Sequence, residues 1–258
     1  MFMMQRMLLI PLLLMAITGF ASANFLRIQN VTILGQDKVN HHTKIQFDLG
    51  WDHSWRDDKN WDAAWVFIKY TTNNGSTWKH ATLSTSSGNH TASPGSVIAP
   101  ATDGKGVFIY RSVNGSGSNN WTGMQLRWNY GTDGVTDSAI VRVKVVGTEM
   151  AYIPSGGFWV GDGNPSGTEY GFRDGTANNP FRIDAESAIS VGGTSTGNMT
   201  TNGAAYDDFT SGVQTLPATF PKGFAAFYIM KHELTQEQYR DFLNSLTRAQ
   251  CSAVAGPW

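Results

Sequence analysis

Apolar and polar residues alternate in short runs along the first half of the chain. In residues 43–51, Ile45, Phe47 and Leu49 fall on one face of an extended strand, and polar residues fall on the other. Turns rich in Asn and Gly separate such runs. The pattern predicts strands at residues 25–34, 43–51, 65–71, 107–113, 124–130 and 139–146. Because no helical periodicity lies between them, these strands predict a β-sandwich over residues 24–147.

The pattern changes after Gly147. Residues 150–160 are predicted to form a bent pair of strands around a Ser-Gly-Gly turn. Residues 161–212 are rich in Gly, Asn, Thr and Ser and show little periodicity, whereas residues 224–230 form a compact apolar strand. A second region, residues 148–258, is therefore expected after the sandwich.

Residues 236–246 have the one convincing helical pattern. Thr235 is placed to cap the N-terminus of this helix, and Gln238, three residues later, completes a capping box. The apolar residues of the helix form a single stripe, made of Tyr239, Phe242, Leu243 and Leu246. The chain is therefore predicted to be mainly β with some α, and this helix needs an apolar partner.

Residues 1–23 have the pattern of a secretory signal peptide. Arg6 precedes an almost wholly apolar run at residues 7–20, and Ala21-Ser-Ala supplies the small residues of a cleavage site. The alternative is a membrane anchor, but the run is shorter than the roughly 20 residues that span a bilayer and contains Pro11. We therefore expect a protein of the cell envelope or a secreted protein, periplasmic or extracellular, with no membrane attachment after cleavage.

Charge and cysteine content narrow the classes further. The 258 residues include 19 Lys and Arg against 20 Asp and Glu, a formal net charge of −1, which leaves no basic footprint for a nucleic acid. With 41% hydrophobic residues, the chain has enough apolar material for packed domains. The single cysteine excludes an intrachain disulfide, and an exported chain without disulfides is more typical of bacteria than of small eukaryotic secreted domains.

Short motifs provide no catalytic and no metal-binding residue. Gly193–Gly197 matches the G-x-S-x-G pattern of hydrolases but lacks the buried strand and the helix that a nucleophile elbow needs on either side. Asp162–Gly167 begins like a calcium loop, but Arg173 takes the place of the bidentate Glu. The histidines form no helical pair and are expected at the surface, and Cys251 has no supporting base nearby.

Tryptophans are concentrated in the first region. Trp55 and Trp61 flank a polar stretch, and exposed aromatic rings on a β-sandwich can stack against sugar rings. The alternative is that the tryptophans fill the core, because each buries a large area. We predict the core for most of them and treat Trp55 and Trp61 as candidates for glycan stacking. A secreted glycan-binding or adhesive β-sandwich protein is therefore one functional hypothesis.

Two blocks of the second region resemble the formylglycine-generating enzyme family, also called sulfatase-modifying-factor domains. Residues 149–162 (EMAYIPSGGFWVGD) look like the opening of the family, commonly Met-x-x-Ile/Val-Pro-x-Gly-x-Phe-x-Met-Gly. Residues 224–244 resemble its next block, in which a strand ending Tyr/His-Glu-Val-Thr runs into a helix with Gln-Tyr-x-x-Phe. The matching positions are His232–Thr235 and Gln238–Phe242. A β-rich domain before such a module is similar to exported bacterial relatives of the family.

The resemblance implies the N-terminal part of an α+β, C-type-lectin-like domain at residues 148–258. Family members usually continue with Arg-Leu-Pro-Thr-Glu-x-Glu-Trp-Glu and Gly-Asn-Val-x-Glu-Trp blocks, the latter near calcium positions, and active members bind copper through a cysteine pair. These blocks and the pair are not in the sequence, so no catalytic, copper or calcium residue is carried over. We expect a truncated chain without catalysis. Its full-length parent would be a formylglycine-generating-type oxidase or a non-catalytic relative, with a protein substrate or a glycan as partner.

Overall fold

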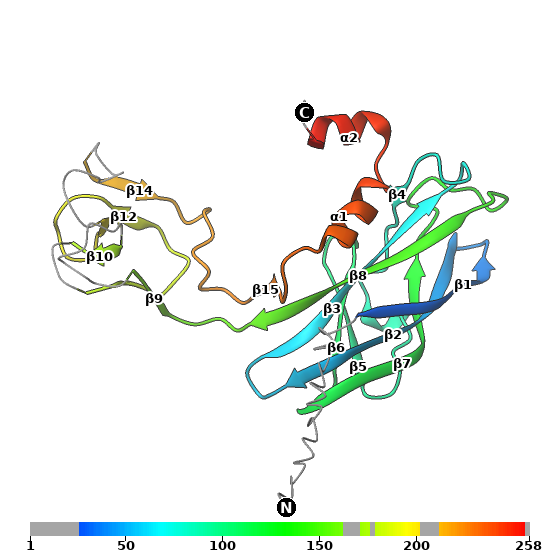
Figure 1. Cartoon of the computed structure of the whole chain (residues 1–258), viewed down its shortest axis with the longest axis horizontal. Helices are drawn as coiled ribbons and strands as arrows, with labels where there is room; N and C mark the ends of the chain where they lie inside the picture. Colours follow the sequence, from blue (N-terminus) through cyan, green and yellow to red (C-terminus); the bar gives the residue numbers. More distant parts are fainter. Residues whose placement is uncertain (1–25, 162–170, 176–178, 202–211, 256–258) are drawn as a thin grey trace, which may run out of the picture.

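A computed structural model of the chain describes residues 26–161, 171–175, 179–201 and 212–255 (Figure 1). The predicted signal peptide at residues 1–23 and the candidate calcium loop that begins at Asp162 lie outside the described residues. Within them the fold is mainly β with a few short helices, which confirms the predicted class. None of the described helices is long and apolar enough to cross a membrane.

Within the described residues, nine strands are joined by hydrogen bonds into one folded sheet. All six strands that the alternation predicts in the first region are present. The strands of the folded sheet are β1 (Arg27–Asp37), β2 (His42–Arg56), β3 (Trp61–Thr71), β4 (Lys79–His80), β5 (Ser96–Pro100), β6 (Val107–Arg111), β7 (Gly115–Trp128), β8 (Arg142–Ile153) and β15 (Phe227–Met230). A short 3-10 helix, Ser87–Asn89, precedes β5.

The sheet folds back on itself, so that two layers enclose one core. In one layer β2 pairs with β1 and β7, and in the other β3 pairs with β6 and β8. The hairpin between β2 and β3 joins the layers where Arg56 pairs with Trp61. Alternate residues of β2, β3, β6 and β7, among them Phe47, Trp51 and Val66, are buried in a single apolar cluster. This layering is consistent with the predicted sandwich.

Strand β8 runs without interruption through the expected boundary at residues 147 and 148, and ends at Ile153. A small unit of short strands follows and lies to one side of the folded sheet (Figure 1). Its strands are β9 (Phe158–Val160), β10 (Phe172–Asp174), β11 (Phe181–Ile183), β12 (Ile189–Val191), β13 (Met199–Thr201) and β14 (Gln214–Leu216). Phe181, Ile183, Val191 and Met199 form a separate core within it. The chain then returns to the folded sheet as β15, which pairs with β8.

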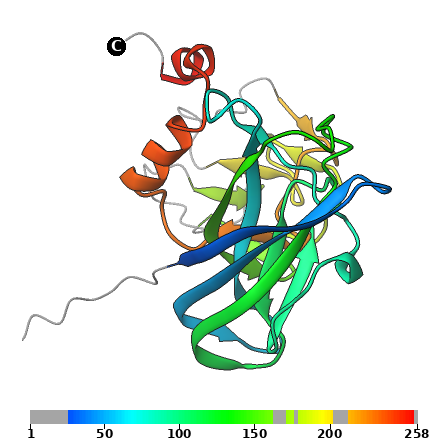
Figure 2. The same ribbon diagram turned by 90° about the vertical axis from the view of Figure 1, so that its right-hand side faces the viewer.

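Two helices follow β15. Helix α1 (Gln236–Leu243) has the predicted capping box: Thr235 Oγ1 accepts from the Gln238 amide, and the Gln238 side chain accepts from the Thr235 amide. Helix α2 spans Arg248–Ala255. The predicted apolar stripe is largely uncovered, with 42% of Tyr239 and 46% of Phe242 exposed. Both helices stand beside the folded sheet (Figure 2).

Candidate functional site

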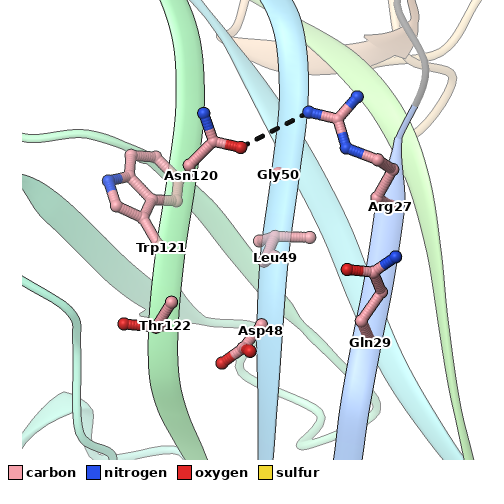
Figure 3. Close-up of a pocket in the computed structure, with 8 residues that line it drawn as sticks. All are labelled: Arg27, Gln29, Asp48, Leu49, Gly50, Asn120, Trp121 and Thr122. Atoms are coloured by element: carbon pink, nitrogen blue, oxygen red, sulfur yellow. Dashed lines mark hydrogen bonds between the residues drawn. The ribbon is translucent and has the colours of Figure 1, made fainter.

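The outer face of β1, β2 and β7 has a hollow above Gly50 (Figure 3). Its volume is about 120 Å³. A methyl group added to Gly50 would lie 2.8 Å from the Asn119 carbonyl oxygen and 3.1 Å from Asn120 Oδ1, so glycine is required here because neighbouring groups already lie close to the backbone. The lining residues are Arg27, Gln29, Asp48, Leu49, Gly50, Asn120, Trp121 and Thr122.

Arg27 is held across the hollow from β1. Its Nη1 donates to Asp52 Oδ2 at 3.0 Å, and its Nη2 donates to Asn120 Oδ1 at 3.4 Å (Figure 3). Asp52, which follows the floor of the hollow on β2, therefore neutralises the guanidinium. The side chain of Arg27 remains partly exposed beside the hollow.

The carboxylates beside the hollow are held in their ionised form. Asp48 accepts from Asn30 Nδ2 at 2.6 Å and from the Gly123 amide at 2.8 Å, and these hydrogen bonds lower its pKa. The hydrogen bond from Arg27 lowers the pKa of Asp52 in the same way. The hollow therefore combines acceptors and donors, and its one guanidinium is outnumbered by two carboxylates, so its chemistry suits a polar ligand without negative charge.

The structure separates the two tryptophans that the sequence singles out. Trp61 stacks on Tyr152 with ring centroids 4.0 Å apart, and the Arg56 guanidinium lies 4.4 Å from its ring centroid. The ring of Trp61 is therefore in contact with side chains of the same chain. Trp55 follows the fully buried Ser54 on β2, so the alternation of the strand directs its half-buried side chain away from the core.

Trp61 belongs to an aromatic cluster on the outer face of the opposite layer. Tyr228, from β15, stacks on Phe108 of β6 with ring centroids 3.8 Å apart, and its hydroxyl accepts from Trp61 Nε1 at 3.1 Å. Burial raises the pKa of Tyr228 to about 12. The sequence predicted the strand of Tyr228 but not this cluster, because its members are far apart along the chain.

A buried group of charges lies on the inner side of the same strands. Asp62 of β3 is 1% exposed and Glu149 of β8 is 7% exposed. Lys231 Nζ donates to Asp62 Oδ2 at 3.0 Å and lies 3.7 Å from Glu149 Oε2. Among the described residues, no group of three or more His, Cys, Asp or Glu side chains is placed to hold a metal ion. The group is therefore an ion-pair network between β3, β8 and the end of β15.

The expectation that all the histidines lie at the surface is wrong for His90, which is only 8% exposed. Its Nε2 lies 2.9 Å from the Ser84 carbonyl oxygen, and its Nδ1 lies 3.1 Å from the Arg127 amide nitrogen. Because Nδ1 accepts from that amide, Nε2 carries the proton and the ring is neutral. Burial also lowers the pKa of His90, because the charged form of the ring is poorly solvated there.

We expect His90 to make the folded state less stable in acid. Below the ordinary histidine pKa of about 6.5, the unfolded chain takes up a proton that the folded chain does not. This contribution to the free energy of unfolding therefore falls as the pH drops below about 6.5, and it is constant above that value. Urea titrations between pH 5 and pH 7.5 should show a shallower pH dependence for His90→Gln than for the wild type.

The matched control for this experiment is His53→Asn, because His53 is exposed and has a positive φ that Asn tolerates. This variant should keep the wild-type pH dependence. Equal slopes for the wild type and His90→Gln would contradict the assignment of a neutral, buried ring to His90.

Two candidates from the short motifs remain, Gly193–Gly197 and Cys251. Gly193–Gly197 lies in the turn between β12 and β13, so a strand and not a helix comes directly after it. Cys251 lies half-buried on α2 as a free thiol. The chain matches no family profile, and no curated protein or solved structure shows significant similarity to it. The resemblance to the sulfatase-modifying-factor family stays a prediction.

Proposed function

We propose that the chain is an exported, non-catalytic carbohydrate-binding protein whose binding site is the hollow above Gly50. The observation that carries this proposal is the hollow itself, about 120 Å³ in volume and lined by the polar side chains of Arg27, Gln29, Asp48 and Asn120. Glycine at this outward position of β2 lets the side chains of Asn120 and Arg27 lie close to the strand, where both contribute polar groups to the hollow.

The lining chemistry favours a polyhydroxyl ligand over an anion. Each sugar hydroxyl both donates and accepts, so it matches a surface of guanidinium, amide and carboxylate groups. The pairing of Arg27 with Asp52 leaves no unbalanced positive charge to select an anion. Trp55 lies farther along the same strand and points away from the core, where its ring can pack against a neighbouring sugar of a chain.

The second region is proposed to have a structural role. The segment that resembles the sulfatase-modifying-factor family forms strand β15 and the capped helix α1, which is the order of elements that the resemblance implies. No catalytic residue of that family is found at the matched positions, so no catalytic role is proposed for this chain. Export is proposed from the signal-peptide pattern of residues 1–23 alone.

The test is a binding screen with the purified chain against insoluble cellulose, chitin, xylan and starch, followed by calorimetry with soluble oligosaccharides of the polymer that retains it. Asn120→Ala should weaken binding about threefold to tenfold, as expected for one lost hydrogen bond of about 0.5–1.5 kcal/mol. Gln29→Ala should weaken binding to a similar extent.

The matched control is Thr32→Ala, which changes an exposed polar residue of β1 outside the hollow. It should bind like the wild type. Retention of none of the four polysaccharides, or equal affinities for Asn120→Ala and Thr32→Ala, would overturn the proposed site.

A further inference from the structure

Strand β15 lies on the edge of β8. Two side chains, Tyr228 and Lys231, contact the folded sheet from opposite faces of this strand. Its backbone pairs with β8 from Phe227 opposite Ile153 to Met230 opposite Met150. The other apolar side chains of this short strand are substantially exposed, including 52% of Ile229. Tyr228 and Lys231 therefore provide its main side-chain contacts with the folded sheet.

Tyr228 anchors the outer face. Its ring extends from β15 to Phe108 on β6, so it crosses β8 and β3. Its hydroxyl is hydrogen-bonded to Trp61 and its ring lies on Phe108, which pairs with Trp65, so the outward residue of β3 between these two contacts is Ala63, which has no exposed surface. The small methyl group there leaves a groove for the ring, and Trp61 Nε1 closes the groove by donating to the Tyr228 hydroxyl.

Lys231 anchors the inner face. Its amide donates to the Glu149 carbonyl oxygen at 3.0 Å, which extends the pairing with β8 by one residue. Its Nζ then enters the region of Asp62 and Glu149, at 3.0 Å and 3.7 Å from their carboxylate oxygens. Two buried carboxylates facing one ammonium group give a strong preference for a cation at this position.

The edge of β8 is thus a complete receptor for an extended segment with the pattern Tyr-x-x-Lys. Backbone hydrogen bonds supply affinity at such an edge, and pockets for particular side chains supply specificity. The connection from Pro154 to Ala226 contains a small unit with its own core, Phe181, Ile183, Val191 and Met199. The contacts within that core do not depend on which copy of the folded sheet receives β15.

We propose that this receptor also binds β15 of a second copy of the chain, so that two copies associate by exchanging Tyr228 and Lys231. The exchanged strand makes the same contacts as the strand of its own copy, so exchange loses none of them. In the wild type the strand of the same copy is tethered to its receptor and competes intramolecularly, so the monomer predominates in dilute solution.

The experiment uses two full-length variants. One loses the side chains that anchor β15 (the donor strand), and the other loses the receptor on the edge of β8. Tyr228→Ala/Lys231→Ala keeps the receptor and loses the strand anchors. Ala63→Leu keeps the strand and fills the groove under the Tyr228 ring, on an outer face where the added side chain does not enter the core. Circular dichroism checks that both variants retain the folded sheet, and light scattering after size exclusion gives their masses.

Each variant alone should be a monomer, and an equimolar mixture should form a complex of one copy of each with twice the monomer mass. Ala63→Ser keeps a small side chain in the groove and should not complement the donor-deficient variant, because its own β15 still occupies its receptor. A mixture that remains monomeric while both variants are folded would overturn the proposal. Dimerisation of either variant alone would overturn it too, because that association would not use the receptor and strand together.

Discussion

Asp62→Ala is expected to lower the free energy of unfolding by about 3–5 kcal/mol, as when one partner of a buried ion pair is removed. The carboxylate is 1% exposed and accepts from four groups. These are Trp51 Nε1 at 2.9 Å, Ser54 Oγ at 2.7 Å, the Trp55 amide at 3.0 Å and Lys231 Nζ at 3.0 Å. Alanine leaves these donors without their acceptor inside the protein, and each unsatisfied buried group is costly.

Urea unfolding followed by tryptophan fluorescence measures this effect. Asp62→Asn should fall between the wild type and Asp62→Ala, because the amide oxygen still accepts while the amide nitrogen faces donors. Asp58→Ala is the matched control: Asp58 is exposed in the β2–β3 turn, where it accepts from Asn114, and its loss should change stability by no more than about 0.5 kcal/mol. A loss below about 1 kcal/mol for Asp62→Ala would show that the network around this carboxylate does not stabilise the fold.

The elements of the fold that follow from local patterns were predicted well. Strict alternation, as in Ile45, Phe47 and Leu49, gave the strands because one face of each strand must be buried. The capping box of Thr235 and Gln238 placed the start of α1, because both of its hydrogen bonds are local. Apart from β9, the short strands of the small unit were not predicted, since three-residue strands within a stretch rich in Gly, Asn, Thr and Ser carry almost no periodicity.

Contacts between distant residues could not be predicted in this way. The ion pair of Asp62 and Lys231 joins residues 169 positions apart, and nothing in either local sequence indicates the other. Trp61 was proposed as a sugar-stacking residue, but its ring packs against Tyr152, which depends on the pairing of β3 with β8. One signal was present and unused: Gly50 takes an outward position in an alternating strand, which marks a close approach to the backbone.

Gly161→Ala is expected to disrupt the small unit while the folded sheet stays intact. Gly161 follows β9 with a φ of +84°, a conformation that costs a residue with a side chain about 1–2 kcal/mol. A methyl group there would also lie 1.7 Å from the Phe172 carbonyl oxygen, which is backbone and cannot rotate away. Gly161 and the start of β10 would have to separate. The core of Phe181, Ile183, Val191 and Met199 is too small to offset that separation.

Amide hydrogen exchange resolves the two parts of the chain in one experiment. In Gly161→Ala, amides of β11 and β12 should lose most of their protection, whereas those of β2 and β7 should keep it, because the large core lies between other strands. Gly156→Ala is the matched control, since a methyl group at Gly156 meets nothing within 4 Å and its φ is not in the left-handed region. Unchanged protection in Gly161→Ala would mean that the close contact with Phe172 is not part of the folded small unit. Loss of protection in β2 and β7 as well would mean that the small unit and the folded sheet unfold together, so that β15 couples them more tightly than its two anchors suggest.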